Sequence, residues 1–144
     1  MKNLSKTLIV LFLTAFTFSS CSDEEDGPTT SGNLVGKWEF FQEGEKIGSN
    51  ENLVSYAHQA GCTKDNVEFK ADGTVVNKLY EIECELFEDE ATYTKSGNSL
   101  TIVDNSGTTE LSIQELTSTT LKVYSTYNED GETITDVTVL KRVN

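Results

Sequence analysis

Basic side chains are scarce in this 144-residue chain. It holds 11 lysines and arginines against 24 aspartates and glutamates, and its formal net charge is −13. Binding to nucleic acid without regard to sequence needs a basic face for the phosphates, and adhesion to anionic lipid needs a polybasic patch. The composition therefore argues against both classes and predicts no nucleic-acid partner.

Residues that carry catalytic chemistry are also few. The chain has one histidine, and it lacks both a Gly-x-Ser-x-Gly elbow and a glycine-rich phosphate loop. A metal site built on His58, Cys62 and Cys84 lacks the fourth ligand that structural zinc takes. The glutamates within 81–85 alternate with Ile82 and Cys84, which predicts a solvated strand face rather than the desolvated site of a general acid. We expect no catalytic residue, no metal and no cofactor, and hence no enzyme.

One apolar run stands out, from Leu8 to about Phe18, and it is shorter than the roughly 20 residues that a membrane-spanning helix needs. Lys2 and Lys6 precede it, and small residues and a cysteine follow it. This order is typical of a cleaved secretion signal. It predicts that residues 1–20 are a signal peptide and take no part in the fold.

The sequence Phe18-Ser19-Ser20-Cys21 resembles the lipobox of bacterial lipoproteins, in a relaxed form similar to that of the Bacteroidetes group. The resemblance implies cleavage before Cys21 and acylation of that cysteine by palmitate-like chains, which supply membrane affinity. The acidic run at 23–26 is similar to that group's surface-export signal, with an ordinary solvated linker as the alternative. We therefore expect an outer-membrane lipoprotein of the cell envelope, exposed at the cell surface, with residues 21–33 as an acidic flexible tether.

Export also fixes the redox compartment of the remaining cysteines. With Cys21 taken by lipid, Cys62 and Cys84 are left as an even pair in an oxidising environment. Such a pair predicts a disulfide, with His58 packed nearby.

Residues 34–144 have the pattern of short strands separated by Gly, Asn or Asp turns. Trp38 and Phe40 lie two apart, so a strand points both to one face. Val137 and Val139 are predicted to face inward in the same way. The predicted strands are 36–42, 67–69, 74–86, 90–95, 99–103, 108–116, 119–127 and 133–143.

Three local details accompany this prediction. Residues 43–61 carry apolar residues near helical spacing, which predicts a short helix or closing loop. The first half of the 74–86 strand breaks alternation at 75–78, which predicts a bulge. Phe41 falls out of register and is expected under the next segment.

About eight consecutive hairpin strands indicate an all-β fold. Eight strands can close into an antiparallel up-and-down barrel, which removes exposed edges, whereas a sandwich is the alternative. Consecutive hairpins favour the barrel.

Gly36-Lys37-Trp38 resembles the Gly-x-Trp motif on the first strand of lipocalins. The segment from Cys62 to Thr74, with Cys84 and the later turn at 96–98, is similar to the lipocalin-like domain of Bacteroidetes lipoproteins. This resemblance implies a barrel in which Trp38 packs at the closed end beneath an arginine of the last strand. Arg142, the one arginine of the chain, is the matching residue. In a strand, however, it points to the same face as Leu140 and to the opposite face from Val137 and Val139.

The resemblance also implies a small apolar ligand in the barrel of a monomeric protein. The inward side chains then form the candidate ligand site: Trp38, Phe40, Phe69, Tyr93, Leu100, Ile102 and Val123. The alternative is a barrel filled by these side chains, whose loops or outer face contact a protein or a glycan.

Overall fold

The computed structural model describes residues 28–143, so the predicted signal peptide, Cys21 and the acidic run lie outside the described residues. The elements in that range are almost all strands. They are β1 (Gly36–Ile47), β2 (Asn50–Ser55), β3 (Asn66–Phe69), β4 (Thr74–Tyr80), a 3-10 turn η1 (Ile82–Cys84), β5 (Leu86–Ser96), β6 (Ser99–Val103), β7 (Thr108–Leu116), β8 (Thr120–Glu129) and β9 (Glu132–Arg142).

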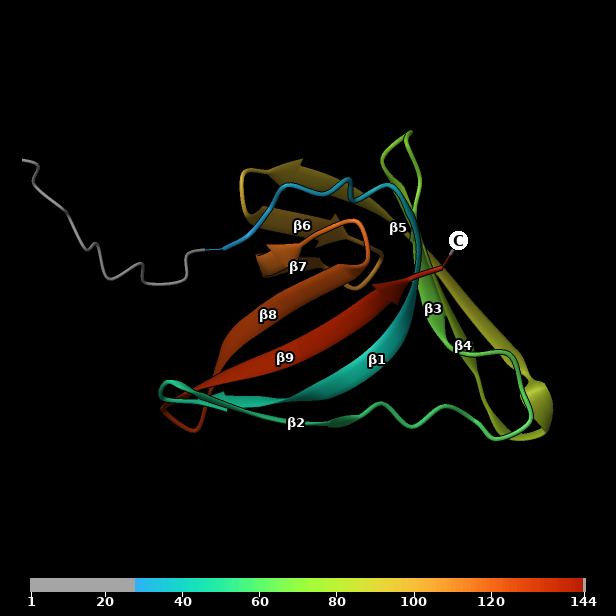
Figure 1. Ribbon diagram of the computed structural model, residues 1–144, viewed down its shortest axis with the longest axis horizontal. Helices are drawn as coiled ribbons and strands as arrows, with labels where there is room; N and C mark the ends of the chain where they lie inside the picture. Colours follow the sequence, from blue (N-terminus) through green and yellow to red (C-terminus); the bar gives the residue numbers. More distant parts are fainter. Residues whose placement is uncertain (1–27, 144) are drawn as a thin grey trace, which may run out of the picture.

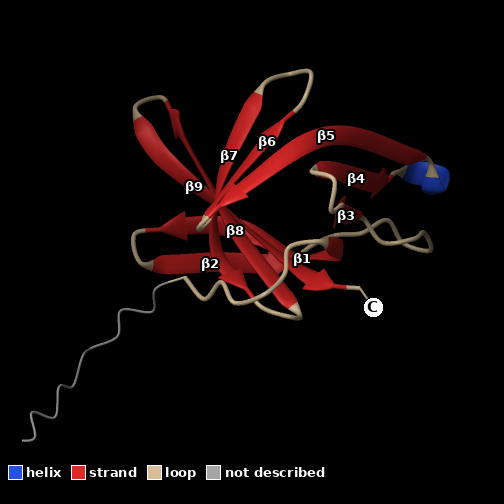
Figure 2. Cartoon of the chain, turned by 90° about the horizontal axis from the view of Figure 1, so that it is seen from above, coloured by secondary structure: helices blue, strands red, loops and turns tan. Residues whose placement is uncertain are grey.

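The strands form one antiparallel sheet that closes on itself (Figures 1 and 2). From β3 to β9 each strand pairs with the next, and β9 returns to pair with β1. The other edge of β1 is shared: its first residues pair with β3 and its last with β2. The result is an eight-stranded barrel with β2 as an additional strand, which confirms the predicted all-β, up-and-down barrel.

Turn chemistry explains the hairpin between β3 and β4. Between β3 and β4, Gly73 adopts φ +88°, and Lys70 N donates to Thr74 O at 2.8 Å. The Asp72-Gly73 pair supplies this positive φ without steric cost. The strands predicted at 99–103 and 108–116 have the observed bounds, and those at 67–69, 119–127 and 133–143 differ by no more than two residues at either end.

The prediction of a helix or closing loop over 43–61 is wrong for its first part. β1 continues to Ile47 and turns back into β2, and residues 56–65 then lead to β3. The alternating residues that become half-buried here are Gln42, Gly44 and Lys46. Because none of them is apolar, hydrophobic periodicity could not mark this hairpin.

The strand predicted over 74–86 is also wrong in its second half. β4 ends at Tyr80, and Leu86 pairs back with it across η1. Glu83 and Cys84 both have φ near +60°, so the chain reverses instead of extending, and Ile82 is 76% exposed. The alternation of glutamates with Ile82 and Cys84 therefore belongs to a turn.

The predicted bulge at 75–78 does not exist, because β4 keeps continuous register with both neighbours. The register shifts lie elsewhere, at Phe41 in β1 and at Gln114 in β7. As the extra residue of its bulge, Phe41 is 48% exposed and is not covered by the next segment.

Residues 28–33, the end of the predicted tether, are held against the barrel. Thr29 bridges to Glu115, and Gly32 N donates to Leu116 O at 2.7 Å. The described chain thus enters at the end of β7, beside the β7–β8 turn. Within residues 28–143 no helix is long and apolar enough to cross a bilayer.

Candidate functional site

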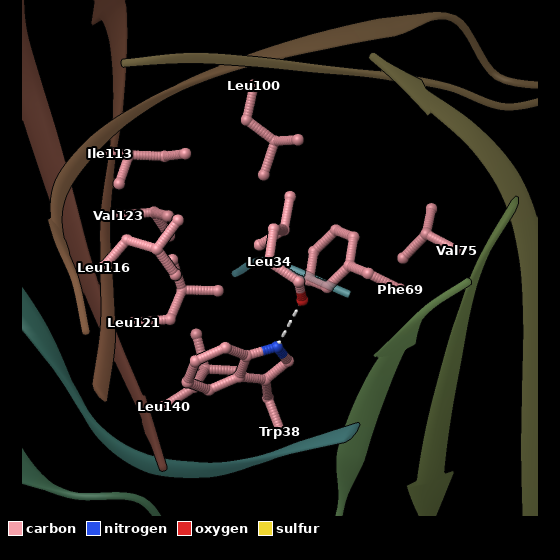
Figure 3. Close-up of a cluster of buried hydrophobic side chains, with 10 residues drawn as sticks. All are labelled: Leu34, Trp38, Phe69, Val75, Leu100, Ile113, Leu116, Leu121, Val123 and Leu140. Carbon is pink, nitrogen blue, oxygen red and sulfur yellow. Dashed lines mark hydrogen bonds between the residues drawn. The ribbon is translucent and has the colours of Figure 1, made fainter. Parts of the chain in front are cut away.

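Trp38 closes one end of the barrel (Figure 3). Its side chain is fully buried, and its indole N–H donates to Leu34 O at 2.9 Å. Arg142 lies opposite Trp38 in the β1–β9 register, with Cζ 4.1 Å from the ring centroid. The guanidinium also donates to Val35 O at 3.0 Å and to Asn33 O. One cation thereby joins the first strand, the last strand and the entering segment.

The parity of β9 corrects the predicted inward face of that strand. Leu140 and Arg142 face the interior opposite Phe40 and Trp38, so Val137 and Val139 face outward. These two valines are nevertheless 1% and 5% exposed. Val137 and Val139 are therefore buried, as the sequence suggested, but on the outer face of the barrel and not in its interior.

The β1–β2 hairpin covers this outer face. In the sheet, β1 and β9 lie between β2 and β8. Glu51 of β2 nevertheless contacts β8, where Lys122 Nζ lies 2.8 Å from Glu51 Oε2 and the Tyr124 hydroxyl donates to Glu51 Oε1. Lys122 and Tyr124 are the cross-strand neighbours of Val139 and Val137. The hairpin therefore folds over the two valines.

The contacts of Glu51 shift two pKa values. Partial burial opposes ionisation of Glu51, but hydrogen bonds from Lys122 and Tyr124 outweigh it and lower the pKa of the carboxyl. Desolvation, and then the Glu51 hydrogen bond, raise the pKa of Tyr124 to about 12. The contact with Lys122 and Tyr124 therefore favours the ionised form of Glu51.

A cavity of about 440 Å³ lies inside the barrel above the closed end. Much of its wall is apolar, and the residues that form that part come from strands all around the barrel: Phe40, Val67, Phe69, Val75, Ala91, Leu100, Ile102, Leu111, Leu121, Val123 and Leu140. Figure 3 shows several of them facing one another from opposite walls. Such a lining suits the hydrocarbon part of a small molecule.

Five of the seven residues predicted for the ligand site line this cavity: Phe40, Phe69, Leu100, Ile102 and Val123. Trp38 and Tyr93 do not. Trp38 forms the closed end, and Tyr93 packs edge-on against Phe69, with ring centroids 5.0 Å apart. The Tyr93 hydroxyl donates to Lys70 O at 2.8 Å, which satisfies it within the wall.

Polar residues that sequence reasoning missed form the mouth side of the cavity. They are Asn77, Asp89, Asp104, Asn105, Ser106, Ser125 and Thr138, with Glu90 also in the wall. Asn77 shares the parity of Val75, which would have placed it inside. The bulge predicted at 75–78 interrupts this alternation, so the sequence alone did not place Asn77 inside.

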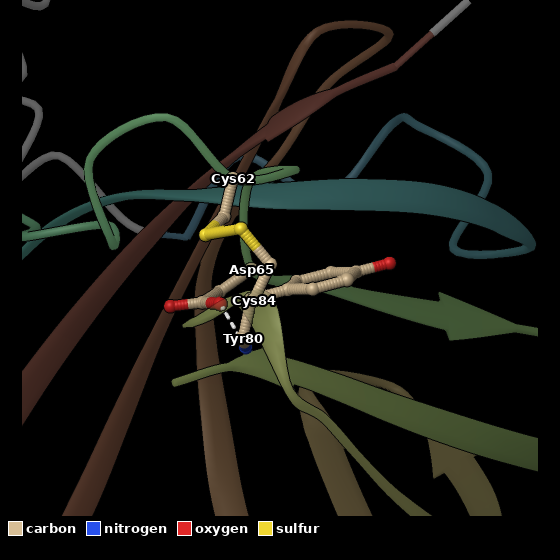
Figure 4. Close-up of a disulfide and its surroundings, with 4 residues drawn as sticks. All are labelled: Cys62, Asp65, Tyr80 and Cys84. Atoms are coloured by element: carbon tan, nitrogen blue, oxygen red, sulfur yellow. Dashed lines mark hydrogen bonds between the residues drawn. A yellow bond between two sulfur atoms is a disulfide. The ribbon is translucent and has the colours of Figure 1, made fainter. Parts of the chain in front are cut away.

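The disulfide between Cys62 and Cys84 is present, as predicted, with Cα atoms 5.3 Å apart (Figure 4). It ties the loop before β3 to the turn between β4 and β5. Beside it, Tyr80 N donates to Asp65 Oδ1 at 2.7 Å. The loop before β3 is thus joined to the turn by one covalent bond and to the end of β4 by one hydrogen bond.

His58 is held in the wall and not in the cavity. Its Nδ1 accepts from Asp65 N at 3.1 Å, so Nε2 carries the proton and donates to Phe40 O at 2.9 Å. Desolvation, and then Asp65, raise the pKa of the neighbouring Tyr56 to about 12. Among the described residues, no group of three or more His, Cys, Asp or Glu is placed to hold a metal ion.

The closed floor, the apolar cavity and the open polar mouth define a calyx-type β-barrel. Residues 34–123 match the family model of the lipocalin-like domain, and the chain belongs to that family. Members of this family generally bind or carry small molecules. No curated protein matches the chain.

Solved structures with the same fold include two from Bacteroides species. A lipocalin-like protein of Bacteroides uniformis aligns with TM-score 0.56 and 13% identity, over 78% of this chain and 100% of that chain. An uncharacterized protein of Bacteroides eggerthii aligns with TM-score 0.52 and 13% identity, over 77% and 100%. Lobster apocrustacyanin A1 aligns with TM-score 0.52 and 15% identity, over 81% and 73%. At these identities the likeness shows the fold alone.

Proposed function

We propose that this protein is a lipid-anchored, monomeric lipocalin-like protein of the cell envelope that binds a small apolar ligand in its barrel. The observation that carries the proposal is the cavity of about 440 Å³ above a closed floor. Its volume lies in the range of roughly 300–1,000 Å³ that is usual for small-molecule sites. In this role the protein binds its ligand without changing it chemically, so a ligand recovered from the protein has the same mass as the free compound.

The cavity also weighs against the alternative of a filled barrel that contacts a protein or glycan. A filled barrel leaves no room between opposite walls, whereas here Phe69 and Val75 on one side and Leu121 and Val123 on the other line the same space.

A cavity-filling variant tests the proposal. Ala91 lines the cavity, and Thr94 lies on the same strand, exposed and off the lining. Residues 22–144, which contain the whole barrel, are titrated with the neutral fluorescent probe N-phenyl-1-naphthylamine. We expect saturable binding that Ala91→Phe abolishes and Thr94→Phe retains. Binding that both variants retain would place the probe on the surface and contradict the proposal.

The anchor is a separate part of the proposal. Six residues lie between Cys21 and Pro28, and the described chain enters at the closed end through Thr29 and Gly32. An acylated Cys21 would therefore turn the floor toward the membrane and the mouth away from it. We expect Cys21→Ala to move the protein from the membrane fraction to the soluble fraction, and unchanged membrane retention would contradict the anchor.

A further inference from the structure

The polar part of the cavity holds a hydrogen-bond acceptor without a donor. In the described part of the chain, Asn77 Oδ1 is the buried side-chain oxygen that has no hydrogen-bond partner, and Asn77 lines the cavity. Leaving such an acceptor unpaired costs about 1–3 kcal/mol. A ligand that donates a hydrogen bond at this point would remove that cost.

Strand register places Asn77 where a ligand's head group would lie. Phe69, Val75 and Ala91 form one inward row across β3, β4 and β5. The next inward row toward the mouth is Val67, Asn77 and Asp89. A hydrocarbon tail packed among the first row and the floor therefore presents its polar end to Asn77 and Asp89.

The charge in this region has one sign. The ionisable residues that line the cavity are Asp89, Glu90 and Asp104, and no described lining residue is a lysine, arginine or histidine. Hydrogen bonds from Ser106, at its side chain and backbone, and from Gly107 lower the pKa of Asp104, which keeps it ionised.

Two lysines lie near this wall, and each pairs with a glutamate, Lys70 with Glu90 of the wall itself. Lys70 Nζ lies 3.8 Å from Glu90, and Lys78 Nζ lies 2.8 Å from Glu88. Lys78 has the parity opposite to Asn77, so it points to the outer face of β4. Asp89 and Asp104 take part in none of the salt bridges of the described residues, so these two side chains at the mouth have no cationic partner in the cavity.

We propose that the ligand is a cationic amphiphile whose protonated amine donates a hydrogen bond to Asn77 Oδ1 and pairs with Asp89 and Asp104, while its hydrocarbon part fills the apolar floor. This inference rests on the proposed function and specifies the class of ligand. A carboxylate is disfavoured twice: it is repelled by the two aspartates, and it has no proton to donate to Asn77. A neutral alcohol can donate but gains no ionic attraction.

A matched series of decyl compounds tests the inference. Decylamine, decanol and decanoate share one hydrocarbon tail, and each is used below its aggregation limit to displace N-phenyl-1-naphthylamine from residues 22–144 at neutral pH. We expect the affinity order amine, alcohol, carboxylate, with roughly tenfold between neighbours at low salt. An equal or higher affinity for decanoate than for decylamine would overturn the inference and leave the proposed function standing. Failure of the probe itself to bind would instead overturn the proposed function.

Variants locate the effect at the proposed contacts. Asp89→Asn with Asp104→Asn removes two charges but keeps an oxygen that can accept from Ser106. It should weaken decylamine roughly tenfold and decanol by less than about twofold. The matched control, Glu110→Gln with Glu132→Gln, removes two exposed charges off the lining and should change neither.

Asn77→Leu provides an independent test. It removes the acceptor at similar volume, and we expect it to weaken decylamine and decanol together and to leave the neutral probe, which lies in the apolar part, within about twofold. An unchanged decylamine affinity in both the Asp89/Asp104 and the Asn77 variants would overturn the inference.

Discussion

At the scale of single residues, two charged side chains join segments of the chain that apolar packing alone does not hold together. Arg142 stacks on Trp38 and donates to the backbone of the entering segment. Glu51 joins the β1–β2 hairpin to β8. Each combines a charge with hydrogen bonds in a partly buried place, where removal of one partner is costly.

We predict that Arg142→Met lowers the free energy of unfolding by about 2 kcal/mol. Methionine keeps much of the packing volume but loses the cation over Trp38 and the donors to the entering segment. Urea unfolding followed by the fluorescence of the single tryptophan measures this loss. The control is Lys95→Met, whose exposed contact to Gly97 O should contribute less than about 0.5 kcal/mol. Equal losses in the two variants would contradict the assigned role of Arg142.

The Glu51 contact predicts a pH dependence with a definite sign. The pKa of Glu51 is lower in the folded protein than its ordinary value of 4.5, so the ionised carboxylate stabilises the fold above that value. The stabilisation is lost as pH falls through the lower, folded-state pKa. We expect Glu51→Gln to cost about 1–2 kcal/mol near neutral pH, and the difference from wild type to shrink as the pH falls below 4.5. A difference that is independent of pH would show that ionisation of Glu51 plays no part.

At the scale of elements, the β1–β2 hairpin and the disulfide are the additions to a simple eight-stranded barrel. The hairpin covers Val137 and Val139 from outside, and it needs a close approach at Gly44. A Cβ there would overlap Asn52 O. Glycine is therefore required by space, since Gly44 has an ordinary strand conformation.

We predict that Gly44→Ala lowers the free energy of unfolding by about 2 kcal/mol, because β2 must move away from the outer face. Thermal unfolding of the variant measures the loss. Gly48→Asn is the control: a Cβ at Gly48 meets nothing, and asparagine tolerates its φ of +61°. If Gly44→Ala proved as stable as the control, the hairpin would not be held against the barrel as described.

The disulfide predicts a second loss at this scale. Cys62 and Cys84 are 22 residues apart, and a bridge of that length contributes roughly 3 kcal/mol in the chain-entropy model. We expect Cys62→Ser with Cys84→Ser to retain the β-sheet circular dichroism but unfold at lower urea concentration. Without reductant, residues 22–144 should show no free thiol in Ellman's assay. Stoichiometric thiol would contradict the bridge.

These elements show where the sequence was informative. Barrel closure followed from regular turn spacing, and the disulfide from an even cysteine pair. Hydropathy does not predict β2, because its partners Gln42, Gly44 and Lys46 in β1 are half-buried by tertiary packing and not because they are apolar. At η1, the alternation of glutamates with Ile82 and Cys84 is typical of a strand, and only the tertiary pairing of Tyr80 with Leu86 reveals the turn.

In the candidate site, too, one part could be predicted from the sequence and another could not. Its apolar half could be predicted from period-two alternation, which places Phe40, Phe69 and Leu100 inside. Its polar half could not, because Asn77 and Asp89 are residue types that usually face water. The parity of Val75 gives the inward position of Asn77 once β4 is known to be continuous. Asp89 lies outside the strand predicted at 90–95, and its inward position follows from its pairing with Asn77.

At the scale of the whole molecule, the barrel has two unlike ends. One is sealed by Trp38, Arg142 and the entering segment. The other opens through a polar mouth above an apolar cavity. The net charge of −13 keeps such a protein dispersed and, with Asp89 and Asp104 at the mouth, makes the approach to the cavity electronegative. The central claim for the whole molecule is therefore that its cavity binds a small molecule.

Native mass spectrometry of residues 22–144, after incubation with a lipid extract of the source cells, tests that claim most directly. We predict one discrete adduct per chain, lost on denaturation and absent from the Ala91→Phe variant. A clean apo mass for the wild-type protein across repeated extracts would contradict the claim and direct attention to a protein or glycan partner instead.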